Sequence, residues 1–269
     1  MAPDVFDDLE RPPLDAAALA RALAGPDRPW REVRVVDRTP STNADLVAEA
    51  RAGTAGGLVL VAEEQTAGRG RLDRSWTSPA RSGLTCSVLL RPEVDRSRWG
   101  WLPLLAGLAA AEAVGRLAEV DVTLKWPNDL LVRDRKLAGL LAEQVDDAVV
   151  LGLGLNVTLR AAELPVPGAT SLAIEGAVCT DRDPLLRAVL RRLAERLAAW
   201  TDSGGEPAAG LGADYRTRCA TLGRTVRVDV PGGAVVEGEA VDVDAAGRLV
   251  VRTATGTVAL AAGDVVHLR

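Results

Sequence analysis

The chain has 269 residues, of which 48% are apolar and 26% are charged, and its formal net charge is −5. This composition is typical of a globular protein and excludes a disordered chain. The negative charge argues against a general nucleic-acid binder, because contacts with the phosphate backbone dominate that kind of affinity.

The cysteines and histidines narrow the possible chemistry further. The three cysteines lie far apart without a C-x-x-C pair, and His267 is the only histidine. This inventory argues against a zinc site and a histidine-based triad. The acidic N-terminus is unlike a signal peptide, no apolar run is long enough to span a bilayer, and free thiols suit a reducing compartment. We therefore expect a cytoplasmic protein without a membrane partner.

The first third of the chain predicts an arm, a short helix, a strand and a second helix. Residues 1–14 are acidic and contain prolines, which indicates a loose arm, and a helix follows from Asp15 to Leu23. Residues 31–37 alternate as a strand does, and residues 44–52 form the next helical pattern. Ser41 and Thr42 are good N-cap residues, and the free N–H groups at that helix start also suit an anion or polar ligand.

The next stretch, residues 63–76, follows a buried apolar strand at 57–61 and is rich in arginine and glycine. Glycine lets a main chain approach a ligand closely, and arginine provides a planar set of donors for carboxylates and phosphates. The stretch is thus a candidate anion-binding loop, the alternative being a solvated basic loop. Its glycines, arginines and closing tryptophan are Gly68, Arg69, Gly70, Arg71, Arg74 and Trp76.

The middle of the chain alternates strands and helices. We expect strands at 83–90, 122–126 and 149–157, a hairpin over 130–144 with a charged tip, and helices at 99–117, 183–200 and from 208 onward. Lys125 lies on a strand between Leu124 and Trp126, where burial of a lysine without a role would be costly. The glycines of the 149–157 strand indicate close approach to its backbone.

From Thr221 onward, four short alternating segments lie at 225–230, 238–243, 248–253 and 257–261, separated by turn residues. They predict a small all-β unit, most simply an SH3-like barrel. The sequence therefore predicts an α/β domain over residues 1–219, with a central mixed sheet flanked by helices, and a small β domain over residues 220–269.

Standard nucleotide motifs are missing. There is no G-x-x-x-x-G-K-[ST], and a G-x-G-x-x-G pattern that begins at Gly152 and Gly154 is broken by Val157. What remains is a set of cationic and polar groups, and phosphoryl or nucleotidyl transfer depends mainly on positioning and charge neutralisation. The set comprises Arg69, Arg71, Arg74, Lys125, Lys136, Ser41, Thr42, Asn43, Gln65, Asn128 and Asn156.

The order of these motifs resembles that of the biotin–protein ligases over about residues 31 to 269. The resemblance covers STN at 41–43, QTAGRGR at 65–71, KWPND at 125–129, KLAG at 136–139 and GLGLN at 152–156. The alanine- and arginine-rich composition is similar to that of actinobacterial members.

The resemblance implies a class II synthetase-like catalytic domain that uses ATP, biotin and the Mg²⁺ that accompanies ATP. Biotin's carboxylate would attack the α-phosphorus to give biotinyl-5′-AMP, and a lysine of a biotin carboxyl carrier domain would then accept biotin. A monomer or weak homodimer is expected, with no metal held by the protein itself.

The resemblance also assigns roles to residues. Lys125, Arg71 and Arg69 would be catalytic. The biotin site would comprise Ser41, Thr42, Asn43, Gln65, Gly68, Arg69, Arg71, Lys125, Gly152 and Gly154. The ATP site would comprise Arg69, Arg71, Arg74, Trp76, Asn128, Lys125, Lys136, Asn156 and Arg269, with Asp264 also within reach if the β domain folds back.

Two departures from the family pattern and three alternatives qualify this reading. Only about 40 residues precede Ser41, too few for the helix-turn-helix domain of some members, so we expect a monofunctional ligase without a nucleic-acid partner. Leu72 and Asp73 replace the glycine, small or basic residues common in the loop, with an effect on adenylate retention that the sequence leaves open. The alternatives are a lipoate–protein ligase, a non-catalytic sensor and an RNA-binding module, the last disfavoured by charge and scarce Phe and Tyr.

Overall fold

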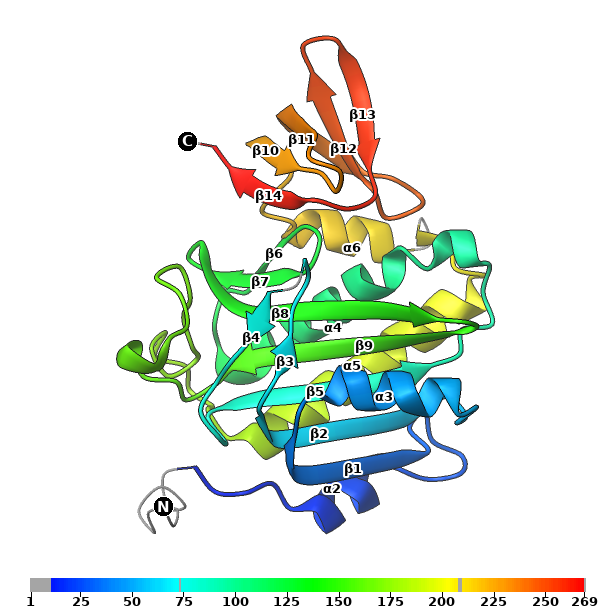
Figure 1. The fold of residues 1–269 in the computed structure, drawn as a ribbon, viewed down its shortest axis with the longest axis vertical. Helices are drawn as coiled ribbons and strands as arrows, with labels where there is room; N and C mark the ends of the chain where they lie inside the picture. The colour runs from blue at the N-terminus through cyan, green and yellow to red at the C-terminus, as the bar shows by residue number, and fades with distance from the viewer. Residues whose placement is uncertain (1–10, 73, 208–209, 269) are drawn as a thin grey trace.

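The computed structural model describes residues 11–72, 74–207 and 210–268, which form a seven-stranded sheet with helices on both faces and a five-stranded C-terminal sheet (Figure 1). Arg269 and Asp73 lie outside these residues. The large sheet has the order β1-β2-β5-β9-β8-β7-β6. Its strands are β1 (Glu32–Thr39), β2 (Leu58–Gln65), β5 (Gly83–Leu90), β6 (Thr123–Lys125), β7 (Asp129–Val132), β8 (Arg135–Val145) and β9 (Ala148–Asn156).

The large sheet is mixed, as predicted. Within this sheet β1 and β2 run parallel, and all other neighbouring strands are paired antiparallel. The predicted hairpin with a charged tip is confirmed as β7 and β8, whose turn residues Arg133 and Asp134 both have positive φ. Across the centre of the sheet, one row of paired residues is Thr85, Gly154 and Gly139, and the next is Ser87, Gly152 and Leu141.

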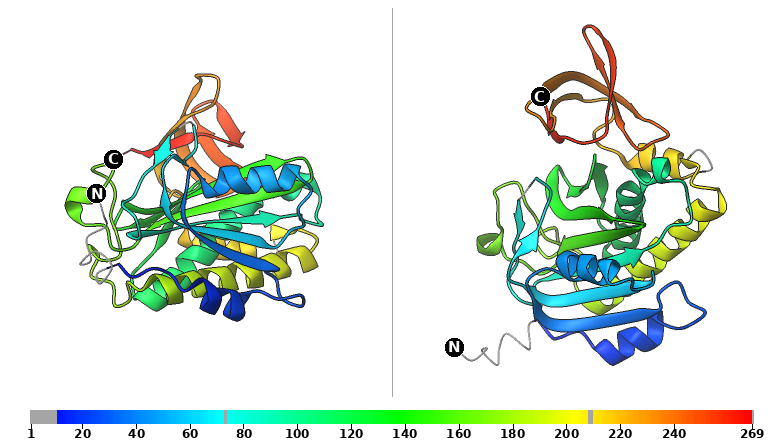
Figure 2. Two further views of the ribbon diagram at one scale, coloured as in Figure 1. Left: turned by 60° about the horizontal axis from the view of Figure 1, so that its bottom comes forward. Right: turned by 45° about the vertical axis from the view of Figure 1, so that its right-hand side comes forward.

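Helices cover the two faces of this sheet unequally. The helix α3 (Thr42–Arg51) alone crosses β5, β9 and β8 on one face, while α4 (Trp101–Ala118) and α5 (Arg182–Asp202) pack together on the other (Figure 2). The helix α2 (Ala16–Leu23) lies beside β1 and α5. By length and composition α4 could cross a membrane, but 72% of it is buried inside the fold, as expected of a core helix.

The prediction of a loose arm over residues 1–14 is wrong for residues 11–14, which contact the rest of the fold, and residues 1–10 lie outside the described part. The Arg11 guanidinium pairs with Glu163 at 2.6 Å, and the Leu14 N–H donates to Glu63 Oε1 at 2.6 Å. Arg182, the partner of Glu63 in a buried ion pair, also donates to the Pro12 carbonyl at 2.6 Å. These partners come from residues 63, 163 and 182, which no local pattern connects to the arm.

The C-terminal sheet has the order β13-β12-β11-β10-β14 and is antiparallel throughout, which confirms the expected small β domain. The sequence reading missed its fifth strand, a four-residue segment that pairs with β10. The predicted boundary at residues 219/220 falls between α6 and β10, and it stays a prediction. The elements are α6 (Leu211–Arg218), β10 (Thr225–Asp229), β11 (Val235–Val243), β12 (Leu249–Thr253), β13 (Gly256–Leu260) and β14 (Asp264–His267).

Trp126 joins the two domains directly after Lys125. Its backbone N–H donates to Thr221 Oγ1 at 3.1 Å and its indole N–H donates to the Gly247 carbonyl at 3.1 Å. The side chain is 1% exposed. The C-terminal domain therefore holds the segment that carries Lys125.

The stability of this junction is expected to depend on pH through His267, the chain's single histidine. Burial lowers its pKa from 6.5 to about 4, and the charges of Lys125 and Arg224 act in the same direction. Because the folded protein holds the ring neutral, its contribution to stability is complete above pH 6.5 and is lost as the pH falls toward 4. Urea unfolding at pH 7.5, 6.5 and 5.5 measures this loss, which His267→Gln should reduce. Equal losses in the two proteins would contradict the prediction.

Candidate functional site

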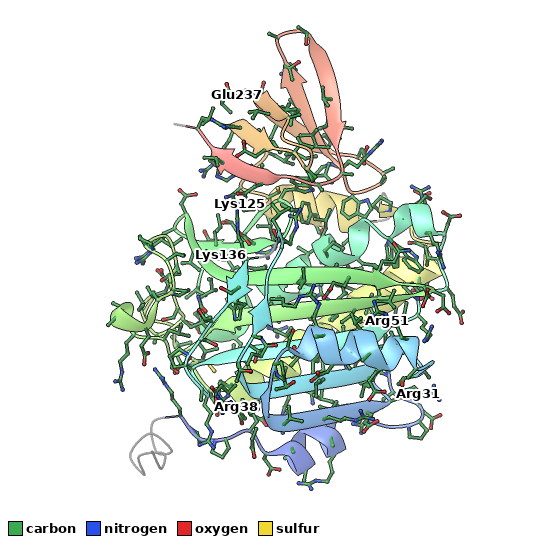
Figure 3. All side chains as sticks on the ribbon, viewed as in Figure 1. Arg31, Arg38, Arg51, Lys125, Lys136 and Glu237 are labelled. Atoms are coloured by element: carbon green, nitrogen blue, oxygen red, sulfur yellow. The ribbon has the colours of Figure 1, made fainter. Side chains whose placement is uncertain are left out.

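A cavity of about 390 Å³ lies on the α3 face of the large sheet, beneath the arginine loop and next to β14. It brings together every predicted site residue that the structure describes except Gly68, and both lysines of the chain, Lys125 and Lys136, line it (Figure 3). Gly68 lies buried beside it, where a Cβ would come closer than 3.0 Å to the Trp76 carbonyl and the Gln65 amide. The predicted residues in its lining are Ser41, Thr42, Asn43, Gln65, Arg69, Arg71, Arg74, Trp76, Lys125, Asn128, Lys136, Gly152, Gly154 and Asn156.

The start of α3 forms one end of the cavity. Ser41 is its N-cap and accepts from the Ala44 N–H at 3.4 Å, so the capping role is confirmed. Gln65 Oε1 accepts from the Thr42 N–H at 2.8 Å and lies 3.0 Å from Thr42 Oγ1. Thr42 Oγ1 also lies 2.7 Å from Ser87 Oγ. This end is therefore a compact polar cluster of amide and hydroxyl groups.

Asn43 extends this cluster across the sheet. Its Oδ1 accepts from Ser87 Oγ at 2.6 Å, and its Nδ2 donates to Glu143 Oε2 at 2.9 Å. The side chain lies directly over Gly152, where a Cβ would come closer than 3.0 Å to Oδ1. The glycine in β9 is thus required by Asn43, a reason that the sequence did not reveal.

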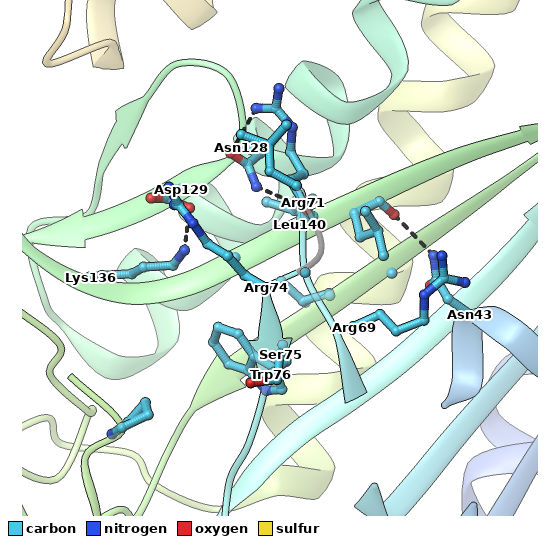
Figure 4. A pocket seen from close by; sticks show the side chains of 18 of the residues that line it. Asn43, Arg69, Arg71, Arg74, Ser75, Trp76, Asn128, Asp129, Lys136 and Leu140 are labelled. Carbon is cyan, nitrogen blue, oxygen red and sulfur yellow. Dashed lines mark hydrogen bonds and ion pairs between the residues drawn. The ribbon is translucent and has the colours of Figure 1, made fainter. Parts of the chain in front are cut away.

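The arginine loop contains the short strands β3 (Gly68–Arg69) and β4 (Ser75–Trp76) (Figure 4), and each of its three arginines contacts another part of the protein. Arg69 pairs with Glu143 of β8 at 3.1 Å, and Arg71 donates to Asn128 Oδ1 at 3.3 Å. Arg74 pairs with Asp264 of β14. Each predicted arginine therefore has a protein partner, and the three partners come from β8, from the turn between β6 and β7, and from β14.

Lys125 differs from the arginines. It lies at the end of β6 and lines the cavity, yet its ammonium group has no hydrogen bond or ion pair with any residue in the ranges that the structure describes. Charged groups in proteins are normally paired or solvated, and Lys125 is only partly exposed. It is therefore a fixed cation that faces the cavity and is available to an anion.

Trp76 lies flat over the glycine row of the sheet. A Cβ on Gly154 would come closer than 3.0 Å to the indole, and one on Gly139 would lie 3.3 Å from it. The Lys136 ammonium lies 6.0 Å from the centre of the indole ring and pairs with Asp129 at 2.6 Å. The two glycines thus create the space that the indole occupies.

Two asparagines complete the wall. Asn128 Nδ2 donates to the Leu140 carbonyl at 2.7 Å, which turns its Oδ1 toward Arg71. Asn156 is 1% exposed and its Nδ2 donates to the Thr170 carbonyl at 2.9 Å. Its Oδ1 is buried without a partner among the described residues. A buried oxygen without a partner is unfavourable, so Asn156 Oδ1 is suited to a ligand group or a cation.

The charged groups of the cavity lie close enough to shift one another's pKa values. Burial lowers the pKa of the Arg71 guanidinium, against the opposing charges of Asp129 and Asp264. Burial also acts to raise the pKa of Asp264, but hydrogen bonds from Arg74 and the charges of Lys125 and Arg71 outweigh it and lower the pKa. The carboxylate of Asp264 is therefore held ionised by the surrounding cations.

Sequence reasoning missed several residues of this site, among them Ser87, Glu143 and Cys86, and it gave no role to Asp129 and no partner to Asp264. Ser87 and Glu143 face the cavity side of β5 and β8, and the alternation of β8 places Glu143 on the same face as Gly139. Asp129 closes the KWPND motif. Cys86, also in the lining, is buried and its pKa is raised to about 12, so it is an unreactive thiol.

No group of three or more His, Cys, Asp and Glu side chains in residues 11–72, 74–207 and 210–268 could hold a metal ion.

Comparisons with known proteins agree with this geometry. Residues 35–156 match the model of the biotin/lipoate A/B protein ligase family, and residues 221–268 match the biotin protein ligase C-terminal domain. The chain is 47% identical to a biotin–[acetyl-CoA-carboxylase] ligase of Mycobacterium tuberculosis, over 97% of this chain and 98% of the relative. Aquifex aeolicus biotin protein ligase in complex with biotin and ATP superposes with a TM-score of 0.76 at 29% identity, over 89% of this chain and 100% of that structure. The Leishmania major ligase in complex with biotinyl-5-AMP superposes with a TM-score of 0.59 at 27% identity, over 86% of this chain and 99% of that structure.

Proposed function

Because the chain belongs to the biotin/lipoate A/B protein ligase family, we propose that its cavity activates biotin with ATP and then transfers biotin to a carrier protein. In the first step a carboxylate oxygen of biotin attacks the α-phosphorus, the bond to the β-phosphate breaks, and pyrophosphate leaves. In the second step a neutral lysine amine attacks the acyl carbon of biotinyl-5′-AMP. AMP then leaves, and the amine loses one proton to solvent.

The observation that carries the proposal is Lys125, a cation that lines the cavity and has no hydrogen bond or ion pair among residues 11–72, 74–207 and 210–268. Step one brings a carboxylate against a polyphosphate, and fixed positive charge is needed to offset that repulsion. Lys125 would contact both the biotin carboxylate and the α-phosphate. Arg71 and Arg69 would approach the phosphates from the loop, exchanging their contacts with Asn128 and Glu143 for the nucleotide.

The polar cluster at the start of α3 supports binding of biotin's ureido ring. The ring has one carbonyl and two N–H groups, and the cluster offers the side chains of Ser41, Thr42 and Gln65. Asn43, Gly152 and Gly154 would shape the slot, since Asn43 and Trp76 already fill the space above the two glycines.

The opposite part of the cavity would hold MgATP. Trp76 would stack on the adenine, and Arg74, Lys136 and Asn128 would face the nucleotide. Asn156 Oδ1 is a buried oxygen without a partner among the described residues, and oxygen is the ligand type that Mg²⁺ prefers. In the proposed reaction Mg²⁺ would enter the cavity bound to the nucleotide.

The partner we propose is the biotin carboxyl carrier domain of an acetyl-CoA carboxylase, after the name of the M. tuberculosis relative. That relative is named as a ligase alone and is matched over 98% of its length, which supports a monofunctional enzyme. We place the enzyme in the cytoplasm, in line with its three free cysteines. A monomer or weak homodimer stays a prediction.

ATP–pyrophosphate exchange by the purified chain with Mg²⁺ tests the proposal, comparing biotin, lipoate and no acid. We expect exchange with biotin alone, followed by transfer of biotin to a purified carrier domain. Exchange with lipoate would assign the chain to the lipoate branch. Tight binding of biotin without exchange would favour a sensor.

Gly154→Ala is expected to lower kcat/KM for ATP by about 100-fold, as a displacement of about 1 Å in a positioning group can do. The added methyl group would displace the Trp76 indole, and β4 with it. Gly139→Ala, whose Cβ would lie 3.3 Å from the indole, should give a smaller loss. Gly168→Ala, where a Cβ meets nothing within 4 Å, serves as the neutral control. Equal activities in the three variants would show that the position of Trp76 is unimportant.

A further inference from the structure

We propose that Glu143 is a positioning residue that fixes which groups at the start of α3 donate and which accept hydrogen bonds. It would thereby select a ligand that presents N–H groups there. This inference rests on the proposed function, because the ureido ring of biotin is such a ligand. Glu143 lies on β8, is 22% exposed in its side chain, and is separated from Thr42 by Asn43 and Ser87.

The first step is the orientation of the Asn43 amide. A carboxylate has acceptor oxygens only, so the group that Asn43 turns toward Glu143 must be its NH₂. The 2.9 Å contact from Nδ2 to Glu143 Oε2 meets that requirement, and a longer contact of 3.4 Å from Nδ2 to the Leu141 carbonyl favours the same orientation. A reversed amide would set Oδ1 against the carboxylate. Because Asn43 is 4% exposed, water cannot replace this contact.

The second step follows from the first. With Oδ1 turned toward Ser87, the Ser87 hydroxyl must donate its only proton across the 2.6 Å contact. Ser87 Oγ can then only accept from Thr42 Oγ1 at 2.7 Å. If Thr42 donates there, no hydroxyl proton remains for its 3.0 Å contact with Gln65 Oε1. The Ser87 and Thr42 hydroxyls therefore supply only two protons for the three oxygen–oxygen contacts that link Asn43 to Gln65.

The consequence is a cluster that is rich in acceptors and one donor short. Thr42 Oγ1 and Gln65 Oε1 keep lone pairs that an incoming N–H can use, and the orientation of Gln65 is fixed by the Thr42 N–H at 2.8 Å. A ureido ring supplies such donors, whereas a dithiolane ring does not. The Glu143 carboxylate would therefore favour biotin over lipoate without contacting either.

Glu143 has a second partner, since its Oε1 pairs with Arg69 at 3.1 Å. An effect of Glu143 on biotin could therefore act through Asn43 or through the arginine loop. Arg69→Gln separates the two, because it removes the contact between the loop and Glu143 and leaves Asn43 and Ser87 in place.

The experiment is isothermal titration of the full chain with biotin and with desthiobiotin, which keeps the ureido ring. Glu143→Gln gives the side chain an NH₂ group and allows Asn43 to reverse. We expect its Kd for both ligands to rise about 10-fold, as for loss of a buried hydrogen bond to a charged group. Ser87→Ala should raise the Kd for both ligands by a similar factor. The double variant should be at most about threefold weaker than the weaker single variant, since both changes act on one chain of contacts.

Glu49→Gln is the matched control, because it removes one of the two carboxylate partners of Arg34 and does not line the cavity. Thermal unfolding checks that each variant is folded. A Kd for Glu143→Gln within twofold of the unsubstituted chain would overturn the inference, as would losses that multiply in the double variant. An equal loss in Arg69→Gln would assign the effect to the loop. Failure of the unsubstituted chain to bind biotin would instead contradict the proposed function.

Discussion

Lys125→Ala is expected to lower biotin-dependent ATP–pyrophosphate exchange by about 1000-fold, the upper range for loss of one group that stabilises developing charge. The ammonium group has no hydrogen bond or ion pair with the residues described, so its removal leaves no protein partner unsatisfied. We therefore expect the fold to persist while the charge on the reacting carboxylate and phosphate goes uncompensated. Exchange rates and the melting temperature of the same preparation measure the two effects.

Two further variants sharpen this test. Lys125→Arg keeps the charge on a wider, planar group and should recover part of the lost activity. Arg34→Ala removes an exposed cation of β1 that pairs with Glu32 and Glu49. It should leave the exchange rate within about twofold of that of the unsubstituted enzyme, because exposed ion pairs contribute little. A Lys125→Ala enzyme that retains more than a tenth of the activity would rule out the role assigned to Lys125.

Glu63→Gln is expected to lower the free energy of unfolding by about 3 to 5 kcal/mol, the usual cost of leaving one member of a buried ion pair alone. Both side chains of the pair with Arg182 are at most 5% exposed. Glu63 also accepts from the Leu14 N–H, a hydrogen bond that the amide oxygen of glutamine can still accept, so we assign the expected loss to the ion pair. Urea unfolding followed by circular dichroism provides the measurement.

The adjacent residue offers a matched control. Glu64 pairs with Arg38 at 3.4 Å on the exposed face, and Glu64→Gln should cost less than about 1 kcal/mol because solvent screens such pairs. In addition, Glu63→Met combined with Arg182→Met should cost less than the sum of the single losses. Similar losses at residues 63 and 64 would mean that burial does not strengthen the pair.

Local sequence patterns were sufficient for most of the fold. Alternation in the apolar strands and the caps at Asp15 and Ser41 identified the elements to within a few residues, because they depend on neighbours in the chain. The strand β14 was missed because its four residues form a strand only by pairing with β10. The segment 11–14 was misread because its polar partners come from distant parts of the chain.

For the candidate site, the sequence by itself determined which motifs this protein carries, and through them its family. The tertiary structure alone decided how the motifs meet: Asn43 over Gly152, Trp76 over Gly154, and the three arginines on Glu143, Asn128 and Asp264. These contacts join residues 57 to 190 positions apart, and a charge or amide in a sequence gives no sign of its partner. The physical reason is that composition and periodicity reflect local energetics, whereas donors, acceptors and ion pairs are matched only after the sheet has brought its strands together.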